Sequence, residues 1–470
     1  MHTVRSWAMG MGLPAWLAAG VGAGQTPPMQ PDIPAAFTAP TGDWDYAKRE
    51  AMIPMRDGVK LHTVIVIPKG AKGAPIILTR TPYDANKRAE RLVSPHMLAT
   101  LPMGDEVFVP EGYIRAFQDV RGKYGSEGDY VMTRPLRGPL NDTAVDHSTD
   151  AYDTIDWLVK NVPESNGRVG MIGSSYEGFT VLMALVNPHP ALKAAVPMSP
   201  MVDGWKGDDW FHNGAFRQTN FDYIYGQTTA RAQGKEIARG AYDDFQLFLA
   251  SGSAGDFAHR FGIDTLPFFN KLAEHPAYDQ FWSAQALDQI LAAQPLKTPT
   301  LYVTSIWDQE DMYGGIHTYE ATEPKDSGHD LNFLALGPWR HSGVNYDGTV
   351  LGPLKFEGNT ALQFRREVMQ PFLDEHLKDG APKADTPPVF VFETGTNVWR
   401  RLPHWPLSCE SGCDWTPQRL YLEPGFGLGL AHRPGTSHRS TSTCPIPRSP
   451  SPTSRGRYTF RTGPPGSAGW

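Results

Sequence analysis

The chain has 470 residues, more than one compact domain usually holds, and 40% of them are hydrophobic against 20% charged. This composition supports a large core and argues against global disorder. A formal net charge of −7 argues against nucleic acid or an anionic membrane as the main partner, because both require a basic surface. Three cysteines exclude a small disulfide-held fold and a zinc module built on cysteines.

The first 24 residues have the pattern of an export signal. Arg5 supplies a positive charge, residues 7–24 are uncharged and rich in Ala, Gly, Met and Leu, and small residues near their end fit a processing site. No later stretch offers the ~18 consecutive apolar residues of a membrane helix. The sequence therefore predicts a signal peptide over residues 1–24 and a periplasmic or secreted mature protein. A proline-rich arm or linker follows over residues 25–45.

Residues 46–203 and 295–375 alternate short apolar runs with helical patterns. The expected strands lie at 59–69, 74–83, 113–122, 168–173, 192–200, 298–308 and 331–341, and the expected helices at 150–161 and 176–186. Apolar strands alternating with helices indicate an α/β fold with a mainly parallel sheet covered on both faces. Functional side chains of such a fold lie at the carboxyl ends of the strands.

Two later regions differ from this alternation. Residues 204–294 are rich in aromatic side chains and carry amphipathic helical patterns at 241–252 and 278–293, which predict a helical cap inserted into the α/β domain. After residue 376 the pattern changes to short β runs separated by Pro, Gly and Trp. This pattern predicts that residues 376–425 begin a β-sandwich.

The last 45 residues, 426–470, contain six arginines, no lysine and no acidic residue. Ser, Thr, Pro and Gly dominate, and neither a strand nor a helix period is present. The segment is a basic tail, a disordered end or a translation out of frame, and the abrupt change of composition favours the frame change. Cys409 and Cys413, just before it, either form a short disulfide or are unrelated loop residues.

A glycine-flanked serine stands between an expected strand and an expected helix. Gly173, Ser175 and Gly178 fit a variant of the G-x-S-x-G nucleophile elbow, with the second glycine one position late. The elbow requires a tight turn that exposes the serine, and glycines on either side let strand and helix approach closely. The sequence therefore predicts Ser175 as a nucleophile.

A serine hydrolase of this fold also needs an acid and a histidine later in the chain, in that order. Asp308 ends one expected strand and His341 follows the next. His341 would accept the proton of Ser175, and Asp308 would hold the imidazole in the right tautomer. The backbone N–H of Tyr176 is one expected donor to the oxyanion, and the Tyr83 hydroxyl is a second candidate.

Five separated motifs together resemble the CocE/NonD hydrolases, which include cocaine esterase and X-Pro dipeptidyl peptidases. They are G-S-S-Y-E-G at 173–178, R-T-P-Y-D at 80–84, D-V-R-G-K-Y-G-S-E-G-D-Y at 119–130, S-I-W-D-Q-E-D at 305–311 and G-P-W-R-H-S-G at 337–343. Within that family they look most like the α-amino acid ester hydrolases, also described as cephalosporin or ampicillin acylases. The resemblance covers about residues 45–425.

The resemblance implies an α/β-hydrolase domain, a helical cap and a C-terminal jelly-roll. It also implies a Ser175–Asp308–His341 triad, with Tyr83 and the Tyr176 N–H as oxyanion hole. Fewer than 100 residues follow position 376, so the jelly-roll is expected to be incomplete. Family members often assemble as homo-oligomers through an N-terminal arm. The proline-rich segment at 25–45 is either such an arm or a linker.

Acidic residues near the expected site distinguish the α-amino acid ester hydrolases from plain esterases. By resemblance, Asp209, Glu310 and Asp311 would surround the α-ammonium of an acyl donor, with Asp208 an alternative to Asp209. Carboxylates focused on one pocket favour a cation and repel anionic acyl groups. A solvated acidic loop is the other interpretation of the same residues.

The sequence therefore predicts an exported serine hydrolase that acts on esters or amides of α-amino acids and transfers the acyl group to water or to a β-lactam amine. The alternatives are a general esterase or glutaryl acylase, an X-Pro dipeptidyl peptidase and an inactive truncated product. The expected partner is a small-molecule substrate. Nothing in the sequence calls for a metal or an organic cofactor.

Overall fold

The computed structural model describes residues 33, 35–37, 42–407, 418–423 and 427–430. Residues 1–43 form one unit and residues 44–470 another, and every element below belongs to the second unit. The predicted signal peptide, most of the arm, the two cysteines at 409 and 413 and nearly all of the basic tail lie outside the described residues. None of the described helices is long and apolar enough to cross a bilayer.

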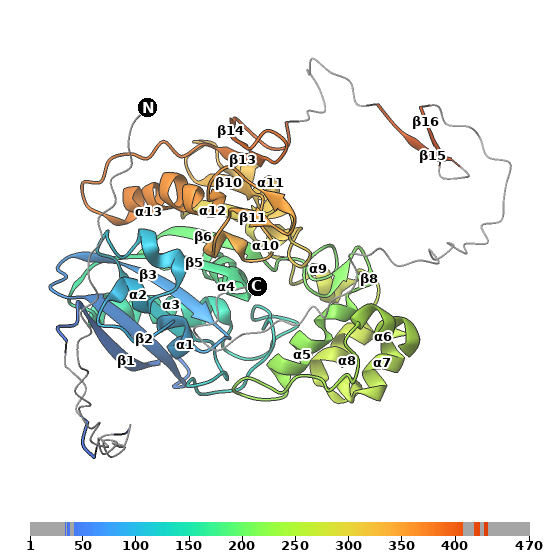
Figure 1. The fold of residues 1–470 in the computed structure, drawn as a ribbon, viewed down its shortest axis with the longest axis horizontal. Coiled ribbons are helices and arrows are strands. Elements are labelled where there is room, and N and C mark those ends of the chain that lie inside the picture. The colour runs from blue at the N-terminus through green and yellow to red at the C-terminus, as the bar shows by residue number, and fades with distance from the viewer. Residues whose placement is uncertain (1–32, 34, 38–41, 408–417, 424–426, 431–470) are drawn as a thin grey trace, which may run out of the picture. The chain divides into compact units, whose positions relative to one another are not determined.

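A ten-stranded sheet forms the centre of this unit, in the order β1-β2-β4-β3-β5-β6-β9-β10-β13-β14 (Figure 1). Its strands are β1 (Tyr46–Pro54), β2 (Lys60–Pro68), β3 (Ala74–Thr81), β4 (Ile114–Asp119), β5 (Ser165–Ser175), β6 (Leu192–Pro200), β9 (Thr300–Ser305), β10 (Asn332–Gly337), β13 (Val389–Glu393) and β14 (Val398–Leu402). The strands from β4 to β13 run parallel, and antiparallel pairing is confined to β1, β2 and β14 at the two edges. The predicted parallel sheet is confirmed.

Helices cover both faces of the sheet. One face carries α3 (His147–Asn161), α4 (Tyr176–Val186), α10 (Leu287–Ala292) and α11 (Gly314–Thr322), and the other carries α12 (Thr360–Phe364) and α13 (Gln370–Leu377). Strand β3 shows why both faces are apolar. Ile76 and Leu78 pack with Ile155 of α3, whereas Ile77 packs in the cluster that includes Phe372 of α13. The two helices predicted at 150–161 and 176–186 are confirmed as α3 and α4.

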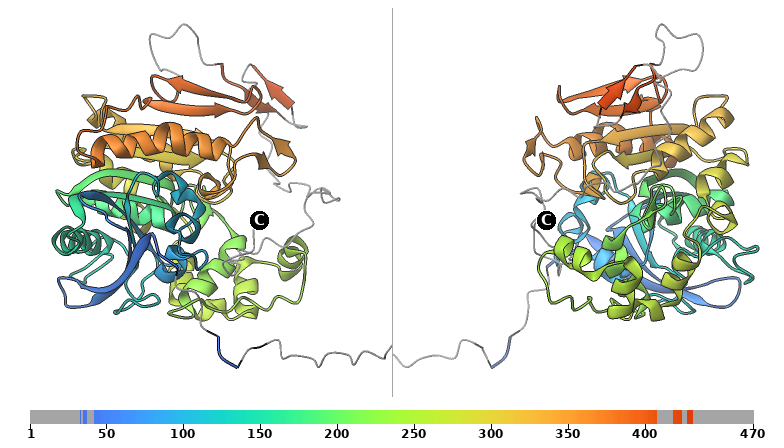
Figure 2. Two further views of the ribbon diagram at one scale, coloured as in Figure 1. Left: turned by 60° about the vertical axis from the view of Figure 1, so that its left-hand side comes forward. Right: turned by 90° about the vertical axis from the view of Figure 1, so that its right-hand side faces the viewer.

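The region predicted as a cap contains short helices, as expected. They are α5 (Phe221–Thr228), α6 (Asp244–Ser251), α7 (Ala254–Arg260), α8 (Pro267–Glu274) and α9 (Gln280–Ser283). Figures 1 and 2 show α5 to α8 gathered beside the sheet rather than on its faces. Their core consists of aromatic and aliphatic side chains, among them Phe221 and Phe257, whose rings stack with centroids 4.8 Å apart.

The prediction of a single helix over 278–293 is wrong, because the helix is interrupted between α9 and α10. Trp282 and Leu287 flank the break and are both buried in the cluster formed with α4 and α11. Five residues apart on a continuous helix, these side chains would point in different directions, so the break lets both reach the same core. Helix α10 consequently packs on α4 and α11 and covers the sheet instead of belonging to the cap.

The predicted β-sandwich boundary at residue 376 is also wrong. Strand β13 lies parallel to β10, with Leu334 opposite Val389, and β14 pairs with β13, so residues 389–402 extend the main sheet. The apolar run of β13 is typical of a parallel strand that is buried on both faces. The first strand of a new β domain can have the same composition, so the sequence did not distinguish the two. Beyond them, β15 (Tyr421–Glu423) pairs with β16 (Gly427–Gly429), so the segment predicted to lack strands after residue 426 contains one.

The remaining short elements are α1 (Ala85–Ala89), α2 (Met97–Thr100), β7 (Phe211–His212), β8 (Ala215–Phe216), β11 (Val350–Leu351) and β12 (Leu354–Lys355).

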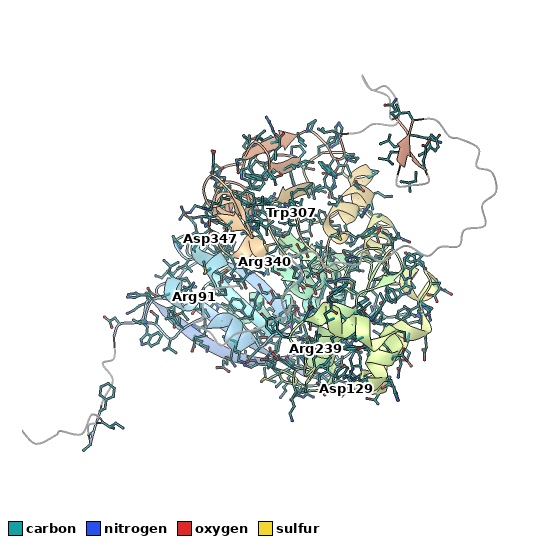
Figure 3. The ribbon with its side chains drawn as sticks, turned by 45° about the vertical axis from the view of Figure 1, so that its right-hand side comes forward. Arg91, Asp129, Arg239, Trp307, Arg340 and Asp347 are labelled. Carbon is teal, nitrogen blue, oxygen red and sulfur yellow. The ribbon has the colours of Figure 1, made fainter. Side chains whose placement is uncertain are left out.

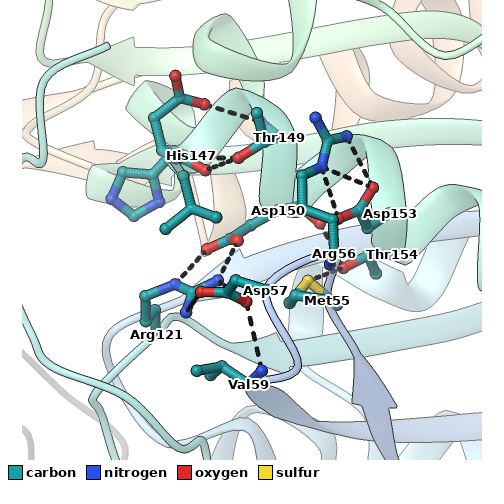
Figure 4. A network of polar contacts seen from close by, with 12 residues as sticks. Met55, Arg56, Asp57, Val59, Arg121, His147, Thr149, Asp150, Asp153 and Thr154 are labelled. Carbon is teal, nitrogen blue, oxygen red and sulfur yellow. Dashed lines mark hydrogen bonds and ion pairs between the residues drawn. The ribbon is translucent and has the colours of Figure 1, made fainter. Parts of the chain in front are cut away.

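A network of buried charges fixes α3 against the β1–β2 turn (Figure 4). The guanidinium of Arg121 donates to Asp150 and Asp57, each over 2.7 Å. Arg56 donates to Asp153 at 2.7 Å on the outer side of the same helix. Asp57, Asp150 and Asp153 therefore each face an arginine. Arg121 belongs to the D-V-R-G motif, which thus has a structural function here.

Candidate active site

Ser175 lies on a strained turn between β5 and α4. Its backbone has φ 64° and ψ −128°, a conformation that residues other than glycine rarely adopt. A Cβ atom on Gly173 would lie 2.6 Å from Glu177, and one on Gly178 would lie 2.9 Å from the Met198 carbonyl oxygen. Both glycines are therefore required by close approach, and the predicted nucleophile elbow is present in its shifted form.

Asp308 and His341 meet at the ends of two neighbouring strands. Asp308 follows β9, His341 follows β10, and His341 Nδ1 lies 2.7 Å from Asp308 Oδ2. The other oxygen of Asp308 accepts the backbone N–H groups of Glu310 (2.8 Å) and Asp311 (3.2 Å). An ionised carboxylate accepts from a donor, so the hydrogen on Nδ1 points to Asp308 and Nε2 faces the site.

The histidine loop contacts the elbow directly. Ser174, which precedes the nucleophile, donates from Oγ to Ser342 Oγ over 2.9 Å, and Ser342 follows His341. The structure thus brings the segments of Ser175, Asp308 and His341 together at the strand ends. Within the described part of the chain, no hydrogen bond joins Ser175 Oγ to His341.

Tyr83 and Tyr176 both lie beside Ser175. The hydroxyls of Tyr83 and Tyr223, the latter from cap helix α5, are hydrogen-bonded over 3.0 Å. Burial raises the pKa of Tyr83 above its usual range, against the effect of hydrogen bonds with Tyr223 and Ser175, so this hydroxyl remains a proton donor. Tyr176 is the first residue of α4, where a backbone N–H has no acceptor within the helix. Both groups are therefore available as oxyanion donors.

Two loops bring the predicted acidic residues together. Asp208 and Asp209 follow β6, Glu310 and Asp311 follow β9, and a backbone bridge joins Asp208 to Asp311. The Asp209 N–H also donates to the Glu310 carbonyl over 3.2 Å. All four side chains are buried. The alternative of a solvated acidic loop is therefore wrong.

Asp208 and Asp209 have different environments, which separates the two alternatives. The carboxylate of Asp208 accepts four backbone N–H groups at 3.0 to 3.1 Å, from Val202, Asp203, Tyr313 and Gly314. Burial raises the pKa of Asp208, and these four donors act in the opposite direction. Asp208 thus holds the two loops together, whereas the carboxylate of Asp209 is left with one long contact from Asn220 (3.4 Å).

Three carboxylate oxygens of the cluster are buried without a hydrogen-bond partner among the described residues: Glu310 Oε2, Asp311 Oδ1 and Asp311 Oδ2. Burial raises the pKa of Asp311 well above its usual range, and the charges of Asp209, Asp208 and Glu310 raise it further. Burial and Glu310 raise the pKa of Asp209 to about 7. Buried carboxylates without partners are costly unless a cation joins them.

No sequence motif identifies Arg217, whose guanidinium acts on the charges of Asp209 and Glu310. Arg217 donates to the Asp209 carbonyl oxygen over 2.8 Å and to the side-chain oxygen of Gln309. It thus orients the two loops through neutral acceptors. Arg217, Asn220 and Tyr223 come from a cap segment that matches no catalytic motif, so only their three-dimensional position identifies them.

His341 Nε2 lies between the nucleophile segment and the acidic cluster. Glu310 Oε2 is 3.4 Å away and Asp311 Oδ2 is 4.0 Å away. Burial lowers the pKa of His341, but the Glu310 and Asp308 carboxylates outweigh burial and raise the pKa to about 9.

Large apolar side chains lie exposed around the loop that follows β9. Trp307 is 51% exposed and Met312 is 48% exposed, on either side of Asp308, Glu310 and Asp311. Figure 3 marks Trp307 in this loop, and Arg340 and Asp347 in the loop that follows β10. Apolar groups at this rim suit a substrate with an aromatic or aliphatic side chain.

This chain is similar to known esterases and peptidases. Residues 57–343 match the sequence model of the X-Pro dipeptidyl-peptidase (S15) family. Cocaine esterase of Rhodococcus sp. (strain MB1 Bresler) is 27% identical over 383 residues, which cover 78% of this chain and 61% of the esterase. A putative serine esterase of Mycobacterium tuberculosis (strain CDC 1551 / Oshkosh) is 25% identical over 430 residues, which cover 79% of this chain and 64% of that protein.

Two solved structures are similar over most of this chain. An α-amino acid ester hydrolase is 66% identical, with a TM-score of 0.81, and the match covers 86% of this chain and 66% of that one. An aminopeptidase from a marine sediment archaeon (Thaumarchaeota archaeon) is 51% identical, with a TM-score of 0.78, over 86% and 65% of the two chains. The chain spans less than two thirds of the length of each of these relatives.

Proposed function

This chain belongs to the X-Pro dipeptidyl-peptidase (S15) family, and from this premise we propose that it is a serine hydrolase for esters and amides of α-amino acids. The acyl group passes through an ester of Ser175 and is then transferred to water or to an amine such as that of a β-lactam nucleus. Cocaine esterase and the α-amino acid ester hydrolase among its relatives support hydrolysis of an acyl bond.

In the proposed reaction Ser175 Oγ attacks the acyl carbonyl carbon while His341 Nε2 takes the hydroxyl proton. Tyr83 and the Tyr176 N–H stabilise the oxyanion of the tetrahedral intermediate. His341 then gives the proton to the leaving alcohol or amine, and the acyl-enzyme remains. Water or an acceptor amine then attacks the carbonyl carbon of the acyl-enzyme while His341 takes its proton. His341 returns a proton to Ser175 Oγ as the acyl group leaves, and Asp308 stabilises the imidazolium in both halves of the reaction.

The observation that carries the proposed substrate class is the set of three unpartnered carboxylate oxygens on Glu310 and Asp311. A substrate ammonium would supply the missing donors and the missing positive charge. Coulomb attraction between a cation and buried carboxylates is strong because little water screens it. An anionic donor such as a glutaryl group would be repelled by the same residues, which argues against the glutaryl acylase alternative.

An aminopeptidase or X-Pro dipeptidyl peptidase is the second candidate. The same cluster would hold a peptide N-terminus, and one similar structure is an aminopeptidase. The position of the cluster favours a substrate whose ammonium is on the α-carbon next to the reacting carbonyl, because Glu310 Oε2 is only 3.4 Å from the imidazole. In a dipeptidyl substrate the ammonium lies one residue farther away, roughly 3.8 Å more along the chain.

The decisive experiment compares D-phenylglycine methyl ester with phenylacetic methyl ester, which differ only in the α-amino group. We expect kcat/KM to be at least about 100-fold higher for the amino ester, a difference of about 2.7 kcal/mol. Glycyl-prolyl p-nitroanilide tests the dipeptidyl alternative, and the Ser175→Ala variant supplies the background rate. Equal rates on the two esters would reject the proposed substrate class. Export and assembly into homo-oligomers remain predictions.

A further inference from the structure

The imidazole of His341 is enclosed by acceptors on both of its nitrogen atoms. Nδ1 lies 2.7 Å from Asp308 Oδ2, which fixes a hydrogen on that nitrogen. Nε2 therefore carries either a lone pair, as a general base must, or a second hydrogen. The atoms that face Nε2 decide between these two states.

Those atoms are carboxylate oxygens of the acidic cluster. Glu310 Oε2 lies 3.4 Å and Asp311 Oδ2 lies 4.0 Å from Nε2, and neither oxygen has a hydrogen-bond partner in the described structure. A lone pair on Nε2 would face negative charge in a buried site. One proton between Nε2 and Glu310 removes that repulsion, and wherever this proton resides, the lone pair is unavailable to Ser175.

The charges around the imidazole ring also favour a proton at this position. The segment after β9 contributes Asp308, Glu310 and Asp311, and the segment after β6 contributes Asp209, whose charge also acts on the imidazole. Arg217 is the neighbouring guanidinium, and its side-chain hydrogen bonds go to neutral oxygens. On the elbow side, Ser342, which follows His341, accepts a hydrogen bond from Ser174. Four carboxyl groups against one guanidinium leave the cluster short of positive charge, and a proton can supply it.

We infer that a proton shared by Glu310 and His341 blocks the general base in the substrate-free enzyme, and that the ammonium group of the substrate releases it. This inference rests on the proposed ammonium site. When the ammonium enters, one positive charge replaces another: the shared proton leaves to solvent and Glu310 ionises beside the ammonium. The now neutral imidazole accepts the Ser175 proton.

Two consequences follow from this exchange. A donor without an amino group leaves the base blocked, so the α-amino group raises the rate of acylation as well as the affinity. In the free enzyme the reactivity of Ser175 increases with pH through the pKa of His341, which Glu310 and Asp308 raise to about 9 against the effect of burial.

The test measures covalent labelling of Ser175 by phenylmethanesulfonyl fluoride, a neutral reagent that has no ammonium group. Rate constants are measured from pH 5.5 to 10 for the wild type and Glu310→Gln. We expect a midpoint near pH 9 in the wild type. In the variant it should fall toward the ordinary histidine value of about 6.5, so that labelling at pH 7 rises at least about tenfold. Asp347→Asn removes an exposed carboxylate from the neighbouring loop and should leave the midpoint unchanged.

A second measurement uses the wild type and a small cation. Methylammonium chloride should accelerate labelling at pH 7 beyond sodium chloride at the same ionic strength, and should have no such effect on Glu310→Gln. Thermal unfolding checks that each variant is folded. If Glu310→Gln does not fold, the wild-type midpoint and the methylammonium effect decide the question.

The outcomes separate this inference from the proposed function. A preference for the amino ester together with a wild-type labelling midpoint near 6.5 would overturn the blocked base and leave the substrate class standing. Equal rates on the two esters, with a midpoint near 9, would overturn the substrate class and leave the blocked base standing. Failure of methylammonium to accelerate labelling of the wild type would overturn release by an ammonium group.

Discussion

Two groups of buried charges in this protein have opposite compositions. In the network of Figure 4, Arg121 faces Asp57 and Asp150, and Arg56 faces Asp153, so each carboxylate has a guanidinium partner. In the cluster beside His341, carboxylates outnumber cations, and three of their oxygens have no partner among the described residues. The cluster beside His341 is buried, whereas the network of Figure 4 is exposed at Arg56, and only this network is neutralised by arginines of the chain itself.

The difference indicates what each group is for. A balanced network stabilises the fold locally, here by holding α3 to the β1–β2 turn. An unbalanced cluster lowers stability, and folded proteins tolerate such strain mainly at functional sites. Under the proposed function, the ammonium group of the substrate supplies the missing positive charge beside Glu310 and Asp311.

Loss of the nucleophile should have the largest effect. Ser175→Ala should lower kcat for D-phenylglycine methyl ester by roughly 10⁴-fold or more, because no acyl-enzyme forms. The melting temperature should not fall, since the serine occupies a strained backbone position and holds no element in place. Residual turnover within tenfold of the wild type would show that another residue is the nucleophile.

Removal of one charge from the balanced network should affect stability and not specificity. Asp150→Asn removes one of the two carboxylates that pair with Arg121 and the carboxylate that lies 3.7 Å from the buried guanidinium of Arg80, and it should lower the free energy of unfolding by about 3–5 kcal/mol. The matched control is Asp153→Asn on the same helix, whose partner Arg56 is exposed and whose loss should cost at most about 1 kcal/mol. Urea unfolding measures both, and equal losses would remove the distinction between the pairs.

Loss of the Tyr83 hydroxyl, the proposed oxyanion donor that follows β3, should have the third-largest effect. Tyr83→Phe keeps the ring and removes the hydroxyl that lies beside Ser175 and Tyr223. We expect kcat to fall roughly 10²- to 10³-fold with little change in KM, because the lost hydrogen bond forms in the transition state. A rise in KM at constant kcat would assign Tyr83 to substrate binding.

A neutral replacement in the unbalanced cluster should have the smallest effect on activity, and it should affect only the ester that carries an amino group. Asp311→Asn should raise KM for D-phenylglycine methyl ester roughly 10- to 100-fold and leave kcat/KM for phenylacetic methyl ester within about threefold. Unlike Asp150→Asn it should not lower the free energy of unfolding, because both oxygens of the buried Asp311 carboxyl group lack a hydrogen-bond partner among the described residues. Equal losses on both esters would reject a specific ammonium contact.

Local patterns predicted most of the sheet and all three residues of the expected triad. Strand and helix periods placed α3, α4 and the central strands, and chain order along a parallel sheet placed Asp308 and His341 on neighbouring strand ends. The pattern did not reveal that β13 pairs with β10, because a buried parallel strand and the start of a sandwich have similar composition. The choice between Asp208 and Asp209 depended on four backbone N–H donors, which no side-chain pattern encodes.

The same limit applies to the cap residues at the site. Arg217 donates to the side chain of Gln309, and Tyr223 shares a hydrogen bond with Tyr83. Both contacts join segments far apart in the sequence, so only the folded chain creates them.

The most direct test of the ammonium site measures binding without turnover. Isothermal titration calorimetry of the Ser175→Ala variant at pH 7 should show D-phenylglycine methyl ester binding at least about 30-fold more tightly than phenylacetic methyl ester, a difference of about 2 kcal/mol. Adding Asp311→Asn should remove most of that difference. Equal affinities for the two esters before that change would contradict the assignment of the buried carboxylates to a substrate ammonium.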